Sequence, residues 1–185
     1  MINYSAIEEK WHKAWTESKV FEPSVNDKKE PYMVFGAFPY VNSPQHIGHL
    51  RTYGTADVNA RYKRMRGYNV LFPMGLHATG TPILAFAKRI LQNDKELIEE
   101  LKNFEISESD IKSMTTPEAI AAYFIREVPK EMQSAGLSID WSRAFISTDR
   151  FFSKFVEWQF GILNSKGFFV QGRHPVGWCP NENNA

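Results

Sequence analysis

The sequence has a single cysteine, no long apolar run and almost no excess of either charge. The one cysteine, Cys179, cannot form an internal disulfide, which excludes disulfide-stapled secreted domains and leads us to expect a reducing, cytoplasmic location. No stretch is long and apolar enough to span a bilayer, and the first residues do not resemble a signal peptide, so no membrane contact is expected. The formal net charge is +1, so any contact with nucleic acid must come from a local basic patch.

What is present is ordinary for a globular domain, except for the aromatic residues. A chain of 185 residues with 43% hydrophobic residues is long enough to bury one core. Aromatic residues make up 14% of the chain, and many of them lie in its last third. We therefore expect this C-terminal third to pack against a partner chain or against a second copy of itself.

The stretch from Tyr32 to His49 contains the most informative pattern. An apolar run over 33–35 has the length and composition of a buried strand, and the prolines, Asn and Ser after it predict a turn over 39–44. A helix over 50–65 follows. Strand, loop and helix in this order aim free backbone N–H groups and the positive end of the helix at an anion.

Two histidines stand at the start of that helix. His46 and His49 are three residues apart, so their side chains are neighbours on one side of a helical turn. Gly48 between them allows a ligand to approach the backbone closely. The pattern predicts phosphate binding by imidazole donors. By itself, however, it also fits a pair of surface or metal-binding histidines.

A second strand over 68–72 follows the helix, which predicts a β-α-β unit with a parallel strand pair. The next loop, over 73–82, then lies beside the first loop at the carboxyl edge of the sheet, where open α/β sheets bind ligands. Another helix should begin near Pro82. The predicted fold is therefore α/β, with a Rossmann-like parallel sheet and helices.

The remaining elements are predicted from composition and apolar spacing. Residues 93–112 are rich in charge, which favours short exposed helix and loop. Residues 117–127 predict a helix, and Pro129 should begin a second short one. Residues 151–165 are apolar nearly all round, so this helix should be buried on most sides. Two short strands are expected last, over 168–170 and 176–178.

Four cations gather near the end of the 50–65 helix: Arg61, Lys63, Arg64 and Arg66. We interpret them mainly as a solvated surface that complements the negative end of the helix dipole. The alternative is a contact with RNA phosphates.

Further motifs surround the histidine pair. Phe38-Pro39-Tyr40 precedes it, and Gly-Leu-His-Ala-Thr-Gly-Thr-Pro follows it over 75–82. Together these motifs resemble the nucleotide-binding half of class I aminoacyl-tRNA synthetases, and within them the leucine–tRNA ligases of archaea and of the eukaryotic cytosol. The resemblance extends from Trp11 to Pro180.

The resemblance implies a two-step reaction, in which ATP with Mg²⁺ activates leucine and the leucyl group passes to tRNA(Leu). Neither step needs a nucleophilic side chain, so the enzyme must hold two anions together and stabilise charge on the α-phosphate. By the same resemblance, His46 and His49 are the catalytic, ATP-binding pair that donates to the phosphates. Gly48 would let the adenine and ribose pack against the backbone.

The leucine-binding residues that the resemblance implies are Phe38, Pro39, Tyr40 and His77. Tyr40 would close over the leucine side chain. His77 stands where many relatives carry Asp and would contact the amino group or ATP, although a histidine must be neutral to accept from a cation. Ordinary core packing stays open for Phe38 and Tyr40, as does a core histidine for His77.

Two further motifs match the family, Asp-Trp-Ser-Arg over 140–143 and Trp-Cys-Pro over 178–180. The first is expected to serve structural packing in the connective peptide. The second matches the place where the family's editing domain is inserted. A lone cysteine without a second ligand at useful spacing is a poor zinc site, so no metal site is expected.

The family's second ATP motif, Lys-Met-Ser-Lys-Ser, does not occur in the sequence. We therefore expect the N-terminal piece of a longer ligase. Its parts would be an N-terminal helix and linker over 1–30, the first half of the nucleotide-binding catalytic domain over 31–135, and the start of the connective peptide over 136–185. Two alternatives stay open: a related nucleotidyltransferase that acts on another acceptor, and a non-catalytic module that binds nucleotide or leucine.

Overall fold

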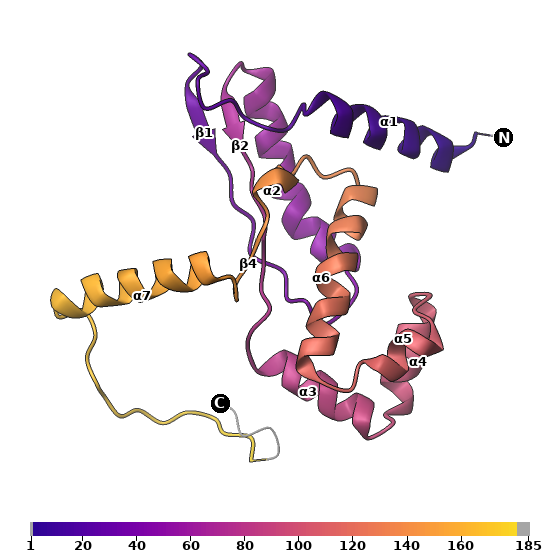
Figure 1. Cartoon of the computed structure of the whole chain (residues 1–185), viewed down its shortest axis with the longest axis vertical. Coiled ribbons are helices and arrows are strands. Elements are labelled where there is room, and N and C mark those ends of the chain that lie inside the picture. The colour runs from indigo at the N-terminus through magenta and orange to yellow at the C-terminus, as the bar shows by residue number, and fades with distance from the viewer. Residues whose placement is uncertain (1, 181–185) are drawn as a thin grey trace.

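The computed structural model describes residues 2–180 and shows a parallel strand layer with helices packed against it (Figure 1). β1 (Pro31–Met33) pairs in parallel with β2 (Asn69–Leu71), and α2 (Ile47–Met65) connects them, which confirms the predicted β-α-β unit. β1 begins earlier than predicted. Its pairing also extends past its last residue, because the backbone N–H of Val34 donates to the carbonyl of Leu71 at 2.9 Å.

After β2 the backbone runs on as a further short strand, which pairs with a third segment of the layer. β3 (Gly75–Leu76) is parallel to β4 (Phe145–Ile146). The contact begins earlier in the chain, where the N–H of Asp140 donates to the carbonyl of Phe72 at 2.8 Å. The prediction of a plain loop over 73–82 was therefore wrong at β3, because the partner of this strand is far away in the sequence and leaves no local signal.

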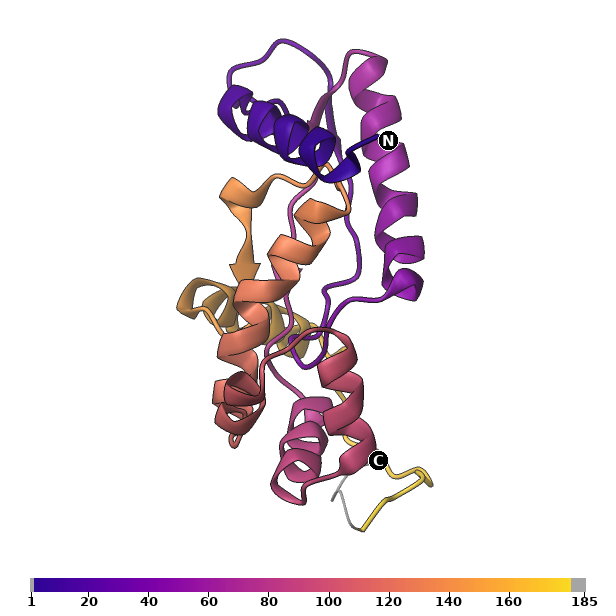
Figure 2. The ribbon, with the colours of Figure 1, turned by 90° about the vertical axis from the view of Figure 1, so that its right-hand side faces the viewer.

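The helices of both crossovers lie on the same face of the layer. In Figure 2, α6 (Pro117–Ser134) lies in front of the strands, with α2 to their right and α3 (Thr81–Leu91) below them, whereas α7 (Arg150–Ser165) lies behind. Right-handed crossovers that move along a sheet in one direction place their helices on one face. The opposite face is left open, so Met33 and Phe35 are 51% and 60% exposed.

The core fills the space between the strands and these helices. α3 and α6 meet through Phe86 and Phe124, whose rings lie edge to face with centroids 6.3 Å apart. α4 (Lys95–Asn103) and α5 (Glu108–Ser113) extend the core and bury apolar side chains, namely Leu97, Leu101 and Ile111. The segment predicted as exposed helix and loop therefore consists of two helices that are anchored by an apolar face.

The N-terminal helix α1 (Tyr4–Ser18) contacts the end of α6 and buries none of its residues. Its N-cap is Asn3. Trp15 packs against Phe21 with ring centroids 5.5 Å apart, and the guanidinium of Arg61 lies 5.5 Å from each ring. These contacts hold α1 against α2.

The cations near the end of α2 make contacts within the chain. Arg61 donates to Asp57 Oδ2 and to the carbonyl of Gly136, both at 2.6 Å. Arg64 donates to Ser138 Oγ at 2.6 Å and to its carbonyl at 3.0 Å, and Asp57 accepts from the Ser138 N–H at 2.6 Å. We call these five residues the α2 clamp. It ties α2 to the segment that leads into β4.

The clamp corrects the interpretation of the basic cluster as a solvated surface. Arg61 and Arg64 are only partly exposed and are bonded inside the chain. The ammonium of Lys63 lies 4.4 Å from the ring centroids of both Tyr32 and Tyr68. Three of the four cations therefore stabilise the fold through contacts that no local pattern predicts.

The prediction of a second short helix starting at Pro129 was wrong. α6 is a single helix with Pro129 inside it. Proline removes one backbone donor and crowds the preceding turn, so an interior proline weakens a helix. Val128 and Met132 are buried in the core, and their burial holds the helix together across this position.

Two predictions about the last third of the chain were also wrong. α7 forms as expected but buries none of its residues, because the described elements cover little of its surface. Residues 168–170 and 176–178 adopt no strand structure. A strand pair is marginal without a third strand or a helix to pack on. Within residues 2–180, no helix combines the length and apolar character needed to cross a membrane.

The strain at Pro129 is directly testable. Pro129→Ala restores a helix donor, and we expect it to stabilise the chain by about 2 kcal/mol, the helix-interior gain less the lost chain stiffness. Chemical denaturation measures this change. Pro117→Ala, at the first turn of α6 where proline is well tolerated, is the matched control and should change stability by less than about 1 kcal/mol. Equal effects at both positions would contradict this description of α6.

Candidate active site

The histidine pair forms a reciprocal cap at the start of α2. His46 is the N-cap, and its Nδ1 accepts from the N–H of Gly48 at 3.0 Å. The N–H of His46 in turn donates to His49 Nδ1 at 3.1 Å. The two rings lie side by side with centroids 4.1 Å apart. The structure therefore brings the predicted pair together and satisfies two of the donors that a helix start leaves free.

This cap decides which nitrogen of each ring carries the proton. A neutral imidazole has one donor and one acceptor nitrogen, so an accepting Nδ1 places the proton on Nε2. Burial, and then the charge of His46, lower the pKa of His49 from its usual 6.5, which favours the neutral ring at neutral pH. Both rings therefore present an Nε2–H donor.

Gly48 is needed for a reason that the sequence does not reveal. A Cβ at this position would lie 2.7 Å from His46 Cε1 and 2.9 Å from its Nδ1. Any side chain here would displace the His46 ring and break its bond to the helix. Close approach of a ligand, the predicted role, is compatible with this steric one.

A cavity of about 200 Å³ adjoins the pair, between the start of α2 and the end of α6. Glu131 of α6 lines it and accepts from the backbone N–H of Gln45 at 2.9 Å. This bond anchors the residue just before His46. Burial raises the pKa of Glu131 above its usual value. Sequence reasoning missed Glu131, because its partner lies on a distant segment.

The second cluster joins the two predicted loops. Tyr40 and His77 form a parallel bridge, in which the N–H of His77 donates to the carbonyl of Pro39 at 2.8 Å. Their rings lie 4.6 Å apart. Tyr40 is 43% exposed and His77 is half-buried, so neither is a core residue. Pro39, whose carbonyl accepts from His77, is buried.

Phe38 belongs to an aromatic cluster beside the second loop. Its ring meets Phe145 edge-on at 5.1 Å and Phe152 at 6.5 Å, and those two rings stack at 5.3 Å. Gly75 leaves room for the cluster, since a Cβ there would lie 2.7 Å from the Phe145 ring. Phe38 therefore makes the packing contacts that its alternative interpretation predicted.

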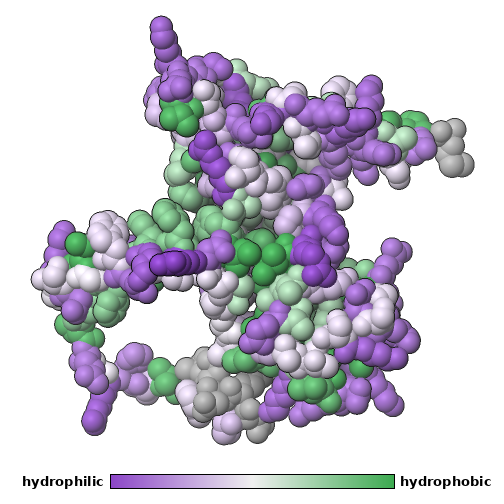
Figure 3. Space-filling model, in the orientation of Figure 1, coloured by the Kyte–Doolittle hydropathy of each residue, from purple (hydrophilic) through white to green (hydrophobic). Residues whose placement is uncertain are grey.

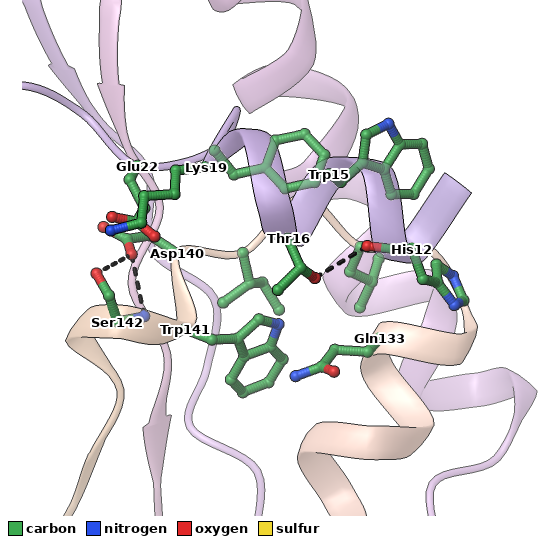
Figure 4. A pocket seen from close by; sticks show the side chains of 12 residues that line it. His12, Trp15, Thr16, Lys19, Glu22, Gln133, Asp140, Trp141 and Ser142 are labelled. Atoms are coloured by element: carbon green, nitrogen blue, oxygen red, sulfur yellow. Dashed lines mark hydrogen bonds between the residues drawn. The ribbon is translucent and has the colours of Figure 1, made fainter. Parts of the chain in front are cut away.

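Two other features lie apart from these clusters. Asp140 accepts from the N–H and the hydroxyl of Ser142 at 3.1 and 2.6 Å, which fits the predicted structural role of this turn. A cavity of about 160 Å³ separates α1 from this turn and is lined by Trp15 and Trp141 (Figure 4). None of the predicted site residues lines it. Residues 2–180 contain no group of three side chains suited to hold a metal ion.

A parallel layer with a capped histidine pair at the start of α2 is the first half of a class I synthetase catalytic fold. The chain belongs to the family of tRNA synthetases class I (I, L, M and V), whose family model matches residues 10–185. The resemblance seen in the sequence is confirmed.

Three similar proteins are leucine–tRNA ligases. Leucine–tRNA ligase 2 of Saccharolobus solfataricus is 54% identical over 172 residues, which cover 92% of this chain and 18% of the relative. Leucine–tRNA ligase 2 of Sulfurisphaera tokodaii is 50% identical over 177 residues, covering 95% and 19%. Leucine–tRNA ligase of Methanococcoides burtonii is 48% identical over 183 residues, covering 98% and 19%.

A solved structure has the same fold. The ternary complex of Agrobacterium radiobacter K84 agnB2 LeuRS with tRNA and LeuAMS matches with a TM-score of 0.72 and 24% identity, over 95% of this chain and 19% of that chain. The chain therefore spans about one fifth of the length of the relatives that it matches.

The raised pKa of Glu131 gives a test of its place beside the histidines. A carboxyl whose pKa is higher in the folded state favours folding below its unfolded pKa and loses that contribution as pH rises through the folded pKa. Glu131→Gln keeps an acceptor for Gln45 but cannot titrate. We expect the melting temperature of Glu131→Gln to rise relative to that of the wild type as the pH rises from about 4 to about 7.

The matched control is Glu99→Gln, an exposed carboxylate on α4. Its difference from the wild type should lack the trend seen for Glu131→Gln. A constant difference for Glu131→Gln across this range would show that the carboxyl is not desolvated by its position.

Proposed function

We propose that the chain is the N-terminal catalytic portion of a leucine–tRNA ligase, which activates leucine with ATP and transfers it to tRNA(Leu). The observation that carries the proposal is the reciprocal cap, because it leaves two Nε2–H donors at the open, positive end of a long helix. The leucine–tRNA ligases among its relatives support the choice of amino acid.

In the first step, negative charge builds on the α-phosphate as the leucine carboxylate attacks and pyrophosphate leaves. The Nε2–H groups of His46 and His49, together with the start of α2, would donate to phosphate oxygens. The donors are oriented before the substrate arrives, so little reorganisation is needed in the transition state. No covalent enzyme intermediate is required, and catalysis rests on positioning and charge stabilisation.

Mg²⁺ would arrive with the triphosphate. Magnesium is usually held by one or two carboxylates together with substrate phosphates, and it keeps several waters. This mode suits a chain whose described residues form no metal-binding cluster of their own. We assign no residue of this chain as a magnesium ligand.

Leucine would lie beside the Tyr40–His77 pair. Tyr40 offers an exposed ring next to the carboxyl edge of the strands, and Pro39 fixes the backbone below it. Phe38 would border the slot from within its aromatic cluster. We propose a cytoplasmic location. The division of the chain into three parts, with boundaries at residues 30 and 135, stays a prediction.

Leucine-dependent ATP–pyrophosphate exchange by the chain tests this function. Exchange that depends on another acceptor would favour a related nucleotidyltransferase, and binding without exchange a non-catalytic module. We expect His46→Ala to lower exchange by about 10²–10³-fold, the usual effect of removing one oriented donor. His46→Asn should keep the cap, since Asn is a good N-cap residue, and still lose the activity.

His174→Ala, at an exposed histidine of the C-terminal segment, is the matched control and should leave exchange unchanged. Full activity of His46→Asn would show that the ring serves the helix cap alone.

We also propose that the C-terminal third associates with another chain or with a second copy. α7 exposes large aromatic side chains on several sides, namely Phe151, Phe155, Trp158 and Phe160. Figure 3 shows apolar residues gathered in the middle of the molecule, near the place where α7 leaves the layer. Apolar patches of this kind mark interaction sites on soluble domains.

Light scattering over a range of concentrations measures this association. The wild-type chain should gain apparent mass as its concentration rises, and Phe155→Glu combined with Trp158→Glu should reduce the gain. Leu91→Glu, at an exposed leucine of α3, is the control and should leave it unchanged. A wild-type chain that stays monomeric at every concentration would contradict the proposal.

A further inference from the structure

Ser147 contacts His77 from the turn that follows β4. Its Oγ accepts from the N–H of Ala78 at 2.9 Å and lies 3.3 Å from His77 Nδ1. The backbone of Ser147 is held in place as well, because its N–H donates to the carbonyl of Leu76 at 2.9 Å. Ser147 therefore contacts the His77 ring although it lies seventy positions further along the chain.

The hydrogen-bonding capacity of this hydroxyl favours one direction for the bond to His77. A serine hydroxyl has one proton and two lone pairs. The N–H of Ala78 can only donate, so it occupies a lone pair. If the hydroxyl donates its proton to His77 Nδ1, it is bonded both as a donor, to His77, and as an acceptor, from Ala78. If Nδ1–H donated instead, the hydroxyl proton would have no acceptor among the residues that the structure describes.

The remaining contacts hold the ring in this position. The backbone of His77 is bonded on both sides, since its N–H donates to Pro39 and its carbonyl accepts from the N–H of Val41 at 3.3 Å. The Tyr40 ring lies 4.6 Å from the imidazole. With Nδ1 facing Ser147, Nε2 is the nitrogen left for a ligand.

We propose that Ser147 is a positioning residue that fixes His77 as the Nε2–H tautomer, so that His77 donates to an oxyanion and does not accept from an ammonium group. The sequence left the amino group and ATP as its two partners. The oxyanion is either the leucine carboxylate or a phosphate of ATP. The identity of this ligand rests on the proposed function, whereas the tautomer is a property of the chain alone.

Long-range ¹H–¹⁵N NMR of the ¹⁵N-histidine-labelled chain reads the tautomer without any ligand. In the wild type, the His77 ring should be protonated at Nε2 and bare at Nδ1. Ser147→Ala should move the ring toward the tautomer mixture of a free imidazole, and Ser147→Thr, which keeps the hydroxyl, should restore the wild-type spectrum. Ser153→Ala is the same change six residues further on and should have no effect. A wild-type Nδ1–H ring, or a Ser147→Ala spectrum like the wild type, would overturn the proposal.

Titration with leucine, leucinol and ATP then identifies the oxyanion. A shift of the His77 Nε2–H signal with leucine but not leucinol, which lacks the carboxylate, identifies the amino-acid carboxylate, and a shift with ATP identifies a phosphate. Ser147→Ala should weaken the binding of that ligand by about 5–10-fold, which corresponds to the loss of one oriented hydrogen bond. An equal response to leucine and leucinol, together with no response to ATP, would overturn the oxyanion role. If neither ligand bound, the proposed function would fail while the tautomer assignment stood.

Discussion

The bond between each histidine ring and the first turn of α2 is the contact on which the proposed chemistry depends. It satisfies helix donors that would otherwise be free, and it sets the tautomer of both rings. Gly48 belongs to the same unit, because a larger residue would displace the His46 ring. A bare His-x-Gly-His pattern suggests two basic groups. The structure shows two rings whose Nδ1 atoms accept from the backbone at the start of α2, which leaves each Nε2 directed away from the helix cap.

A second constraint holds that helix in place. The α2 clamp joins the far half of α2 to the segment that enters β4, through the buried carboxylate of Asp57. The same segment ends at Ser147 beside His77. One stretch of chain therefore supports both the phosphate-facing helix and the loop that we assign to leucine. Removing Arg61 from this partly buried ion pair would be costly, since the Asp57 carboxylate would be left buried without its charged partner.

The sequence predicts what short-range physics determines. The β-α-β unit follows from an apolar run, a helical stretch and a second run, and the closeness of the two histidines follows from their spacing, whereas the cap that they form was not predicted. Distant contacts leave no such signal, which is why the partners of Arg61 and Arg64 and the role of Ser147 were missed. The predicted helix start at Pro129 was wrong because burial of the neighbouring side chains in the core outweighs the tendency of proline to interrupt a helix. The burial of α7 was inferred from its composition, which says that apolar surface exists but not what covers it.

The open face of the strand layer and the exposed rings of α7 show that the described residues leave apolar surface to be covered. The capped histidines, by contrast, are complete within one helix turn. A crystal structure of the chain with a non-hydrolysable ATP analogue tests them most directly. The account predicts phosphate oxygens within about 3 Å of Nε2 of both His46 and His49. Phosphates bound elsewhere, with both rings contacting only the backbone of α2, would contradict it.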